Sequence, residues 1–145
     1  MNIKDSPYCN CLYFSLGAMS RQIQKIAEEE FRETGLSPSH AFVLMSVNAR
    51  QEINPGEIAK ELLLAPSTVT RLIEKLEALQ LVQRENEGKY MKVITTSKGL
   101  EKDIRIRKAW ENLFKRYTHT LGQSFSTKLT ENLQEAFSKS NRNKS

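Results

Sequence analysis

Apolar residues recur every three or four positions along most of this 145-residue chain, which is the period of helices that bury one face. The spacing predicts a long first helix from Pro7 to Glu33, which Gly35 ends. Its apolar positions form a seam of the coiled-coil type, typical of a helix that packs along another helix: Leu12, Leu16, Met19, Ile23 and Ile26.

Four prolines are expected to lie in the first turn of four helices, where the missing N–H costs nothing. They are Pro7, Pro38, Pro55 and Pro66, and the first three follow Ser or Asn, which are good N-cap residues. Short helices are therefore predicted from Pro38 and from Pro55. In the second of these, Asn54 and Glu57 have the spacing of a capping box.

The helix predicted from Pro66 to Leu79 has one apolar stripe and one polar face. The stripe consists of Val69, Leu72, Ile73, Leu76 and Leu79, and the outward face carries Ser67, Thr70, Arg71 and Glu74. Residues 81–86 and 89–96 then read as two strands of a hairpin with a very short tip at Glu87-Gly88. Two further helices are predicted over residues 97–121 and 126–137, and residues 139–145 are expected to be a disordered tail.

The order of these elements predicts the fold class, which is mainly α with a small β-hairpin wing. Two short helices, a tight turn, a helix with an exposed polar front and a hairpin form a winged helix-turn-helix. In such a motif the second helix enters the major groove of DNA with its N-terminal residues at the base edges. Small hydroxyl residues there allow the backbone to approach DNA closely. The simpler interpretation, compatible with the first, is that Ser67 and Thr68 cap the helix in place of Ala65.

The run EIAKELLLAPSTVTRLIEKLEALQLVQR, followed by a hairpin and by VITTSKGL, resembles the MarR family of bacterial transcription regulators. The resemblance covers essentially the whole chain. It implies a single domain over residues 1–145 with a winged helix-turn-helix lobe at 36–97. It also implies a helical dimerisation region built from residues 1–33 and 98–138, so that a homodimer binds double-stranded DNA.

Three features depart from the family pattern. Gln80 stands where the family usually has glycine, which predicts a left-handed backbone at a cost of about 1 kcal/mol. The shortened wing tip carries Lys89 instead of the family's arginine, and lysine offers a point charge without the bidentate fork. Residues 66–92 carry five basic and four acidic side chains, so the predicted recognition module is not strongly positive.

The net charge, the cysteine count and the absence of catalytic motifs limit which classes of function the chain can have. The formal charge of +5, from 22 Lys and Arg against 17 Asp and Glu, permits a nucleic-acid partner without demanding one. Two cysteines and no long apolar run favour a soluble protein of the reducing cytoplasm with no membrane partner. His40 and His119 are isolated and no nucleophile or phosphate-binding motif is present, so we expect neither an enzyme nor a bound metal or cofactor.

The resemblance implies a sequence-specific regulator that binds a pseudo-palindromic operator as a homodimer. Repressor and activator are both open from the sequence, and a repressor is the role we favour. The expected DNA contacts are Ser67, Thr68, Thr70, Arg71, Lys75 and Lys89. The resemblance also implies a small-molecule or oxidant signal, with Phe14, Phe42 and Trp110 as candidates to line an effector site or simply to form core. The alternative function is a winged helix that binds proteins and not DNA.

Cys9 and Cys11 are redox candidates, because some family members carry a reactive cysteine in the first helix. Neither residue aligns cleanly with that position. Residues two apart do not share a helix face, so an intersubunit disulfide is favoured over an internal one. The interpretation we favour is that both are small apolar residues buried at the dimer seam.

Overall fold

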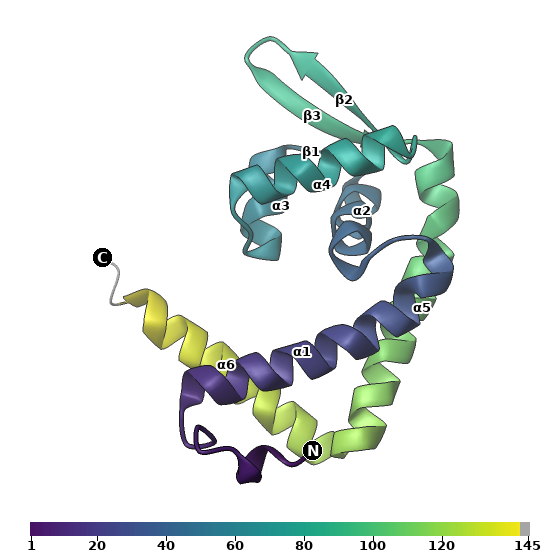
Figure 1. Ribbon diagram of the computed structural model, residues 1–145. Helices are drawn as coiled ribbons and strands as arrows, with labels where there is room; N and C mark the ends of the chain where they lie inside the picture. The colour runs from purple at the N-terminus through teal and green to yellow at the C-terminus, as the bar shows by residue number, and fades with distance from the viewer. Residues whose placement is uncertain (143–145) are drawn as a thin grey trace. The chain divides into compact units, whose positions relative to one another are not determined.

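The computed structural model describes residues 1–142, in which helices predominate and a small antiparallel sheet forms the wing (Figure 1). By its internal contacts the chain divides into two compact units, Met1–Trp110 and a second that begins at Glu111. The first unit holds the sheet and the helices up to residue 110. No helix within residues 1–142 is both long enough and apolar enough to cross a membrane.

The first helix is shorter than its apolar period predicts. Helix α1 is Leu12–Phe31, so the predicted start at Pro7 is wrong. Tight turns replace the expected first helical turn: the Tyr8 N–H donates to Ser6 Oγ at 3.2 Å, and the Cys11 N–H donates to the Tyr8 carbonyl at 2.9 Å. These local bonds satisfy the backbone in a non-helical form. After α1 a short 3-10 turn, Arg32–Thr34, ends at Gly35 in the left-handed region, as the sequence predicts.

The other three prolines do begin helices, and these form the helical part of the lobe. They are α2, Pro38–Arg50; α3, Pro55–Leu62; and α4, Pro66–Ala78. Both halves of the predicted capping box of α3 are present. The side chains at the centre of the unit are fully or almost fully buried and come from α2, α3, α4, the turn after α4 and the sheet: Val43, Leu44, Val47, Ile58, Val69, Ile73, Leu76, Leu81, Val82 and Val93.

The wing belongs to a three-stranded antiparallel sheet. Its strands are β1, Glu52–Ile53; β2, Val82–Glu87; and β3, Tyr90–Thr95, in the order β1-β3-β2. Glu87 pairs with Tyr90, so the hairpin tip consists of Gly88 and Lys89, one residue beyond the predicted tip. The strand β1 has only two residues, which is too short for a period-2 pattern to appear in the sequence.

The junction between α4 and β2 is a tight turn with the left-handed backbone predicted for Gln80, whose φ is +62°. The Leu81 N–H donates to the Leu76 carbonyl at 3.0 Å, and the Thr96 hydroxyl donates to the Gln80 carbonyl at 2.7 Å. The Lys98 ammonium donates to the Leu79 carbonyl at 3.1 Å. These bonds tie the end of α4 to the beginning of α5, Ser97–Leu121.

The first turns of α5 are fixed to the lobe by a buried polar group on α2. The amide nitrogen of Asn48 donates to the Gly99 carbonyl at 3.1 Å and to Asp103 Oδ1 at 3.0 Å, and its oxygen accepts from the Thr95 hydroxyl at 2.6 Å. A Cβ added at Gly99 would lie 2.2 Å from the Leu81 carbonyl oxygen, so only glycine permits this approach. The base of the wing and α5 therefore meet at a rigid corner.

In the second unit, α6 runs over Gln123–Arg142 and is longer than the predicted 126–137. The expectation of a disordered tail from residue 139 is wrong for residues 139–142. The Ser140 hydroxyl donates to the Ala136 carbonyl at 2.9 Å and Lys139 pairs with Glu135 four residues earlier, so these polar side chains make helical i, i+4 contacts. Residues 143–145 of the predicted tail lie outside the described residues.

Candidate nucleic-acid interface

The N-terminal front of α4 presents polar groups to solvent. Its N-cap is Ala65 and no side chain makes a capping hydrogen bond, so the interpretation of Ser67 and Thr68 as caps is wrong. Ser67 is exposed and Thr68 is half-buried. The first N–H groups of the helix are consequently left without a side-chain acceptor, and the helix dipole makes this end attractive to anions.

The following turn of α4 carries two further predicted contact residues. Thr70 and Arg71 are both exposed, and the Thr70 hydroxyl donates to the Pro66 carbonyl at 3.0 Å. No hydrogen bond or ion pair holds the Arg71 guanidinium within residues 1–142. Because Val69, Leu72 and Ile73 are buried on the opposite side, the helix cannot rotate about its axis without exposing apolar surface.

Lys75 lies one turn further along α4, exposed and near α2. Burial, and then repulsion from the Lys75 ammonium, lower the pKa of His40 below its ordinary value. The imidazole Nδ1 of His40 lies 2.5 Å from Ser37 Oγ, and a neutral ring can accept that hydroxyl proton. His40 is thus a half-buried residue at the boundary between α2 and α4.

The structure brings Lys89 of the wing tip to the same groove as α4. This groove has a volume of about 310 Å³ and is lined by Asn54, Pro55, Thr70, Ile73, Arg84, Lys89, Tyr90 and Met91. Tyr90, 70% exposed, was not among the residues selected from the sequence. The only sequence signal for it is its position next to Lys89 at the predicted hairpin tip.

One cation of the wing is held by acidic residues of α4. The guanidinium of Arg84 on β2 donates to Glu77 Oε1 from Nη2 at 2.8 Å and from Nε at 3.1 Å, and Glu74 Oε1 lies 3.9 Å away. The hydrogen bonds from Arg84 hold the pKa of Glu77 below its usual value. The Arg84 N–H also donates to Glu77 Oε2 at 3.1 Å. This pair fixes the wing against α4 and neutralises the charge of Arg84.

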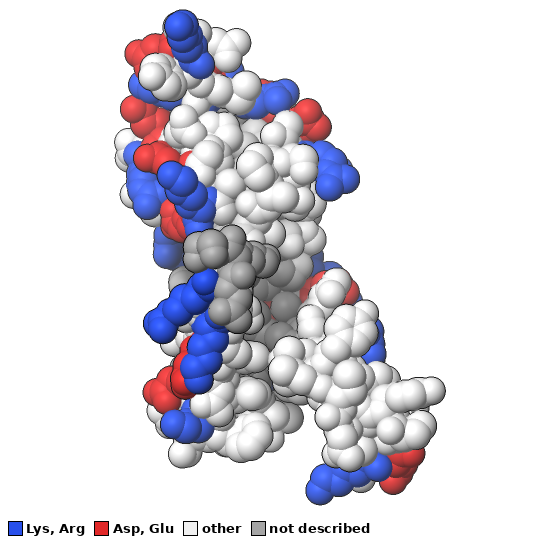
Figure 2. All heavy atoms as spheres, turned by 90° about the vertical axis from the view of Figure 1, so that its left-hand side faces the viewer, with Lys and Arg blue, Asp and Glu red and all other residues white. Residues whose placement is uncertain are grey.

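A second cation is neutralised on the other side of the hairpin. The Lys92 ammonium lies 2.7 Å from Glu87 Oε2 and 3.3 Å from Glu52 Oε1, and these carboxylates raise its pKa. On the face shown in Figure 2, Lys and Arg side chains are interspersed with Asp and Glu at the end that bears the sheet. On the surface formed by α4 and the hairpin, the cations without a carboxylate partner among residues 1–142 are Arg71, Lys75 and Lys89.

The two cysteines lie away from this surface, in the turns before α1. Cys11 is exposed at the N-cap of α1, and Cys9 is half-buried with its carbonyl accepting from the Ser15 hydroxyl at 3.0 Å. In the single chain they are thus not buried residues of a helix seam. Among residues 1–142 no group of three or more His, Cys, Asp or Glu side chains could hold a metal ion.

Residues 34–89, which include α4 and Lys89 of the wing tip, match the model of the MarR family. The HTH-type transcriptional repressor MdtR of Bacillus subtilis is 32% identical over 95 residues, which are 66% of this chain and 61% of that protein. The matched part thus spans about three fifths of the repressor's length.

Solved structures share the fold. The MepR-DNA complex of S. aureus has a TM-score of 0.77 at 16% identity and covers 88% of this chain and 96% of that one. A cysteine-to-serine mutant of E. coli MarR complexed with operator DNA has a TM-score of 0.78 at 16% identity, with 91% and 99% covered.

Proposed function

Because the chain belongs to the MarR family, we propose that it is a transcription regulator, a repressor, that binds a pseudo-palindromic operator as a homodimer. The observation that carries the proposal is the front of α4. Ser67, Thr70 and Arg71 are exposed there, no side chain caps the helix, and no partner holds Arg71 among residues 1–142. The wing-tip lysine lines a groove together with Thr70 of this helix. The two solved relatives that contain DNA support this choice of partner.

Each contact residue has a role that follows from its position on the helix. Arg71 has a free guanidinium fork on the solvent side of α4, which suits two parallel hydrogen bonds to the O6 and N7 atoms of guanine. Ser67, Thr68 and Thr70 are short enough to let the helix front approach base edges and phosphates closely. Lys75 and Lys89 are placed beside this front and neutralise phosphates without reading sequence.

The homodimer is supported by apolar side chains that the single chain leaves exposed. These are Leu12, Leu16, Ile104, Trp110, Phe114, Phe125, Leu133 and Phe137. Soluble monomers rarely expose so many large apolar side chains, and a second copy would bury them. Sedimentation at micromolar concentration is expected to give twice the chain mass, whereas the mass of one chain would refute the dimer. Two-fold symmetry then places the half-sites about one helical turn apart.

Selection from a pool of random duplexes tests DNA binding directly. The full chain is expected to enrich a pseudo-palindromic sequence whose recovery falls as salt rises. Enrichment of no sequence, with the protein folded by circular dichroism, would refute the proposal and favour the winged helix as a protein-interaction module. A parallel selection from the same pool with the Arg71→Ala variant distinguishes two causes of duplex recovery. One is sequence-specific contact through α4, which the variant weakens, and the other is retention of any duplex by general basic charge.

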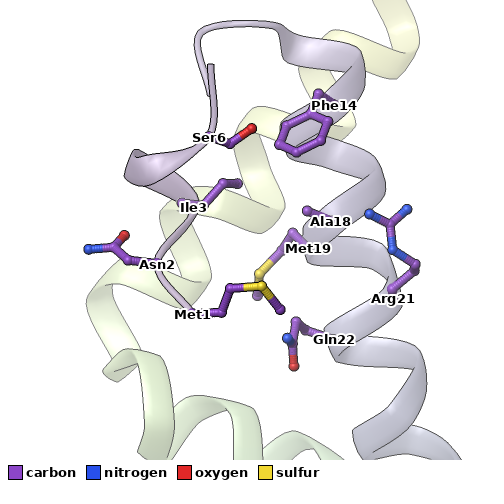
Figure 3. A pocket seen from close by; sticks show the side chains of 9 residues that line it. All are labelled: Met1, Asn2, Ile3, Ser6, Phe14, Ala18, Met19, Arg21 and Gln22. Carbon is purple, nitrogen blue, oxygen red and sulfur yellow. The ribbon is translucent and has the colours of Figure 1, made fainter. Parts of the chain in front are cut away.

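A small-molecule or oxidant signal is proposed to modulate the binding. Exposure of Cys11 in a turn makes its thiol accessible to an oxidant and to the same thiol of another copy. The apolar candidates for an effector site have other roles in the lobe: the rings of Phe42 and Trp110 pack edge to face with centroids 6.0 Å apart, and Phe42 also packs on Phe31. Phe42 is half-buried by these contacts, whereas Trp110 stays 47% exposed in the single chain. The third candidate, Phe14, lines a pocket elsewhere (Figure 3).

A further inference from the structure

The first turn of α2 brings a histidine close to the polar face of α4. His40 is the third residue of α2, a helix that packs against α4 in the lobe (Figure 1). The His40 side chain is half-buried, and the Lys75 side chain of α4 is exposed. The two are near enough for the Lys75 ammonium to lower the pKa of the imidazole. Two nitrogen-bearing side chains from different helices therefore lie near one another at the edge of the surface proposed to bind DNA.

The N-cap serine of α2 determines which imidazole nitrogen carries the proton. Nδ1 of His40 lies 2.5 Å from Ser37 Oγ. The Ser37 oxygen also accepts the His40 main-chain N–H at 3.4 Å, so the hydroxyl proton is available to Nδ1. The proton of the neutral ring is then on Nε2. Nε2 makes no hydrogen bond within residues 1–142, which leaves a donor without an acceptor on a half-buried side chain.

Protonation would make His40 a donor at both nitrogens. Nδ1–H can then donate to Ser37 Oγ while Nε2–H stays available. In the free chain, burial and then the Lys75 ammonium disfavour this charged form. Within residues 1–142 no carboxylate is among the groups that act on His40, whether from α1, α3, α4, α5 or the sheet, and none pairs with Lys75. Both cations thus lack a counter-ion, which one phosphate could supply.

We propose that His40 and Lys75 together bind one phosphate of the operator backbone, and that protonation of His40 strengthens this contact, so that affinity for DNA rises as the pH falls. A contact of this kind positions the lobe on the duplex without reading bases, because a phosphate carries no sequence information. The inference rests on the proposed function for its partner, DNA. The proximity of His40 and Lys75 can be tested in the free chain.

The direction of the pH effect follows from linkage. A phosphate stabilises the imidazolium, so the pKa of His40 is higher in the complex than in the free chain. Affinity then rises as the pH falls through the pKa of the complex, and it becomes constant below the lower pKa of the free chain. If the two pKa values differ by about one, affinity changes about tenfold. Between about pH 8 and about pH 5.5 the slope of log affinity against log salt should also steepen by about one.

Three variants isolate His40 when binding is measured with the duplex that the selection enriches. His40→Gln keeps an N–H donor that cannot be protonated, and it is expected to lose a rise in affinity of about 5–10-fold on acidification. His40→Lys carries a permanent charge and is expected to bind with the same high affinity at both pH values. His119→Gln is the matched control, since it removes the chain's other histidine from an exposed position on α5, and it should follow the parent.

Nuclear magnetic resonance of the imidazole Cε1–H signals measures the two pKa values directly. The pKa of His40 is expected to be higher in the duplex complex than in the free chain, whereas the pKa of His119 is expected to be the same in both. An equal pKa of His40 in both states, or the same pH profile of affinity for the parent and His40→Gln, would overturn the proposal.

The free chain provides a test that does not depend on DNA. Lys75→Gln is expected to raise the pKa of His40, because it removes the repulsion from the ammonium. An unchanged pKa would show that the two side chains are too far apart to share a phosphate, and it would overturn the proposal. Failure of the parent to bind any duplex at either pH would instead refute the proposed function, and this inference with it, even where Lys75→Gln raises the pKa.

Discussion

Replacing Gln80 with glycine is expected to stabilise the protein, although the change removes a side chain. Gln80 has a φ of +62°, in the left-handed region that costs an L-residue about 1–2 kcal/mol. Its exposed side chain makes no hydrogen bond among the described residues. Both backbone bonds of the residue, from its N–H to the Glu77 carbonyl and from the Thr96 hydroxyl to its own carbonyl, are available to glycine. The substitution therefore removes strain without removing a contact.

The expected gain is smaller than the strain, because glycine gives the unfolded chain more freedom, at a cost of about 0.5–1 kcal/mol. A net stabilisation of about 0.5–1 kcal/mol follows. With a urea dependence of about 2 kcal/mol per molar, the unfolding midpoint rises by about 0.3–0.5 M. The comparison must use equal protein concentrations, since a dimer's midpoint depends on concentration.

Gln83→Gly is the matched control, since it removes the same side chain from an exposed position. Gln83 lies in β2, paired with Ile94, where the backbone is extended. Glycine there relieves no strain and is expected to lower stability by about 0.5–1 kcal/mol. If Gln80→Gly lowers the midpoint as Gln83→Gly does, the left-handed backbone at Gln80 is not a source of strain and the reasoning fails.

Three further predictions concern charge and redox chemistry. Lys75→Ala and Lys89→Ala should each weaken all duplexes alike and reduce the slope of log affinity against log salt by about one, whereas an unchanged slope would show that the lysine contacts no phosphate. The lowered pKa of Glu77 stabilises the folded state above its usual value of 4.5, and this contribution is lost as the pH falls through the lowered pKa. Glu77→Gln should therefore show a smaller loss of thermal stability on acidification than the parent, and identical pH profiles would contradict the role of the pair. Peroxide should weaken duplex binding by the parent but not by the protein with both cysteines replaced by serine, and an equal response of the two would exclude the thiols as sensors.

The helices could be predicted from the sequence where a local start signal, such as proline in the first turn, coincides with the start of an apolar stripe of helical period. Pro38, Pro55 and Pro66 begin helices because each lies where a buried stripe starts. Pro7 has the same local signal, a preceding serine, but no apolar stripe begins there, and the Ser6 side chain stabilises a turn. A capping signal therefore predicts a helix start only when the next turns have a face to bury.

The parts of the site that depend on tertiary pairing were not predictable. Ser67, Thr70 and Arg71 follow from the phase of one helix, and the structure exposes all three. The Arg84–Glu77 pair joins a helix to a strand, and no periodicity relates two residues in different kinds of element. The same holds for Tyr90 in the groove beside α4. The exposed polar front of α4 was therefore predictable from the sequence, whereas the position of the wing against it required the structure.

The measurement that tests the central claim most directly is a comparison of the sequences selected by the parent and by Arg71→Ala. If α4 reads bases through this side chain, the variant should lose preference at one position in each half-site and about 1–3 kcal/mol of affinity for the parent's duplex. Circular dichroism should show both proteins equally folded, because Arg71 is exposed and outside the core. An unchanged selected sequence bound with unchanged affinity would contradict the claim that the front of α4 recognises DNA through Arg71.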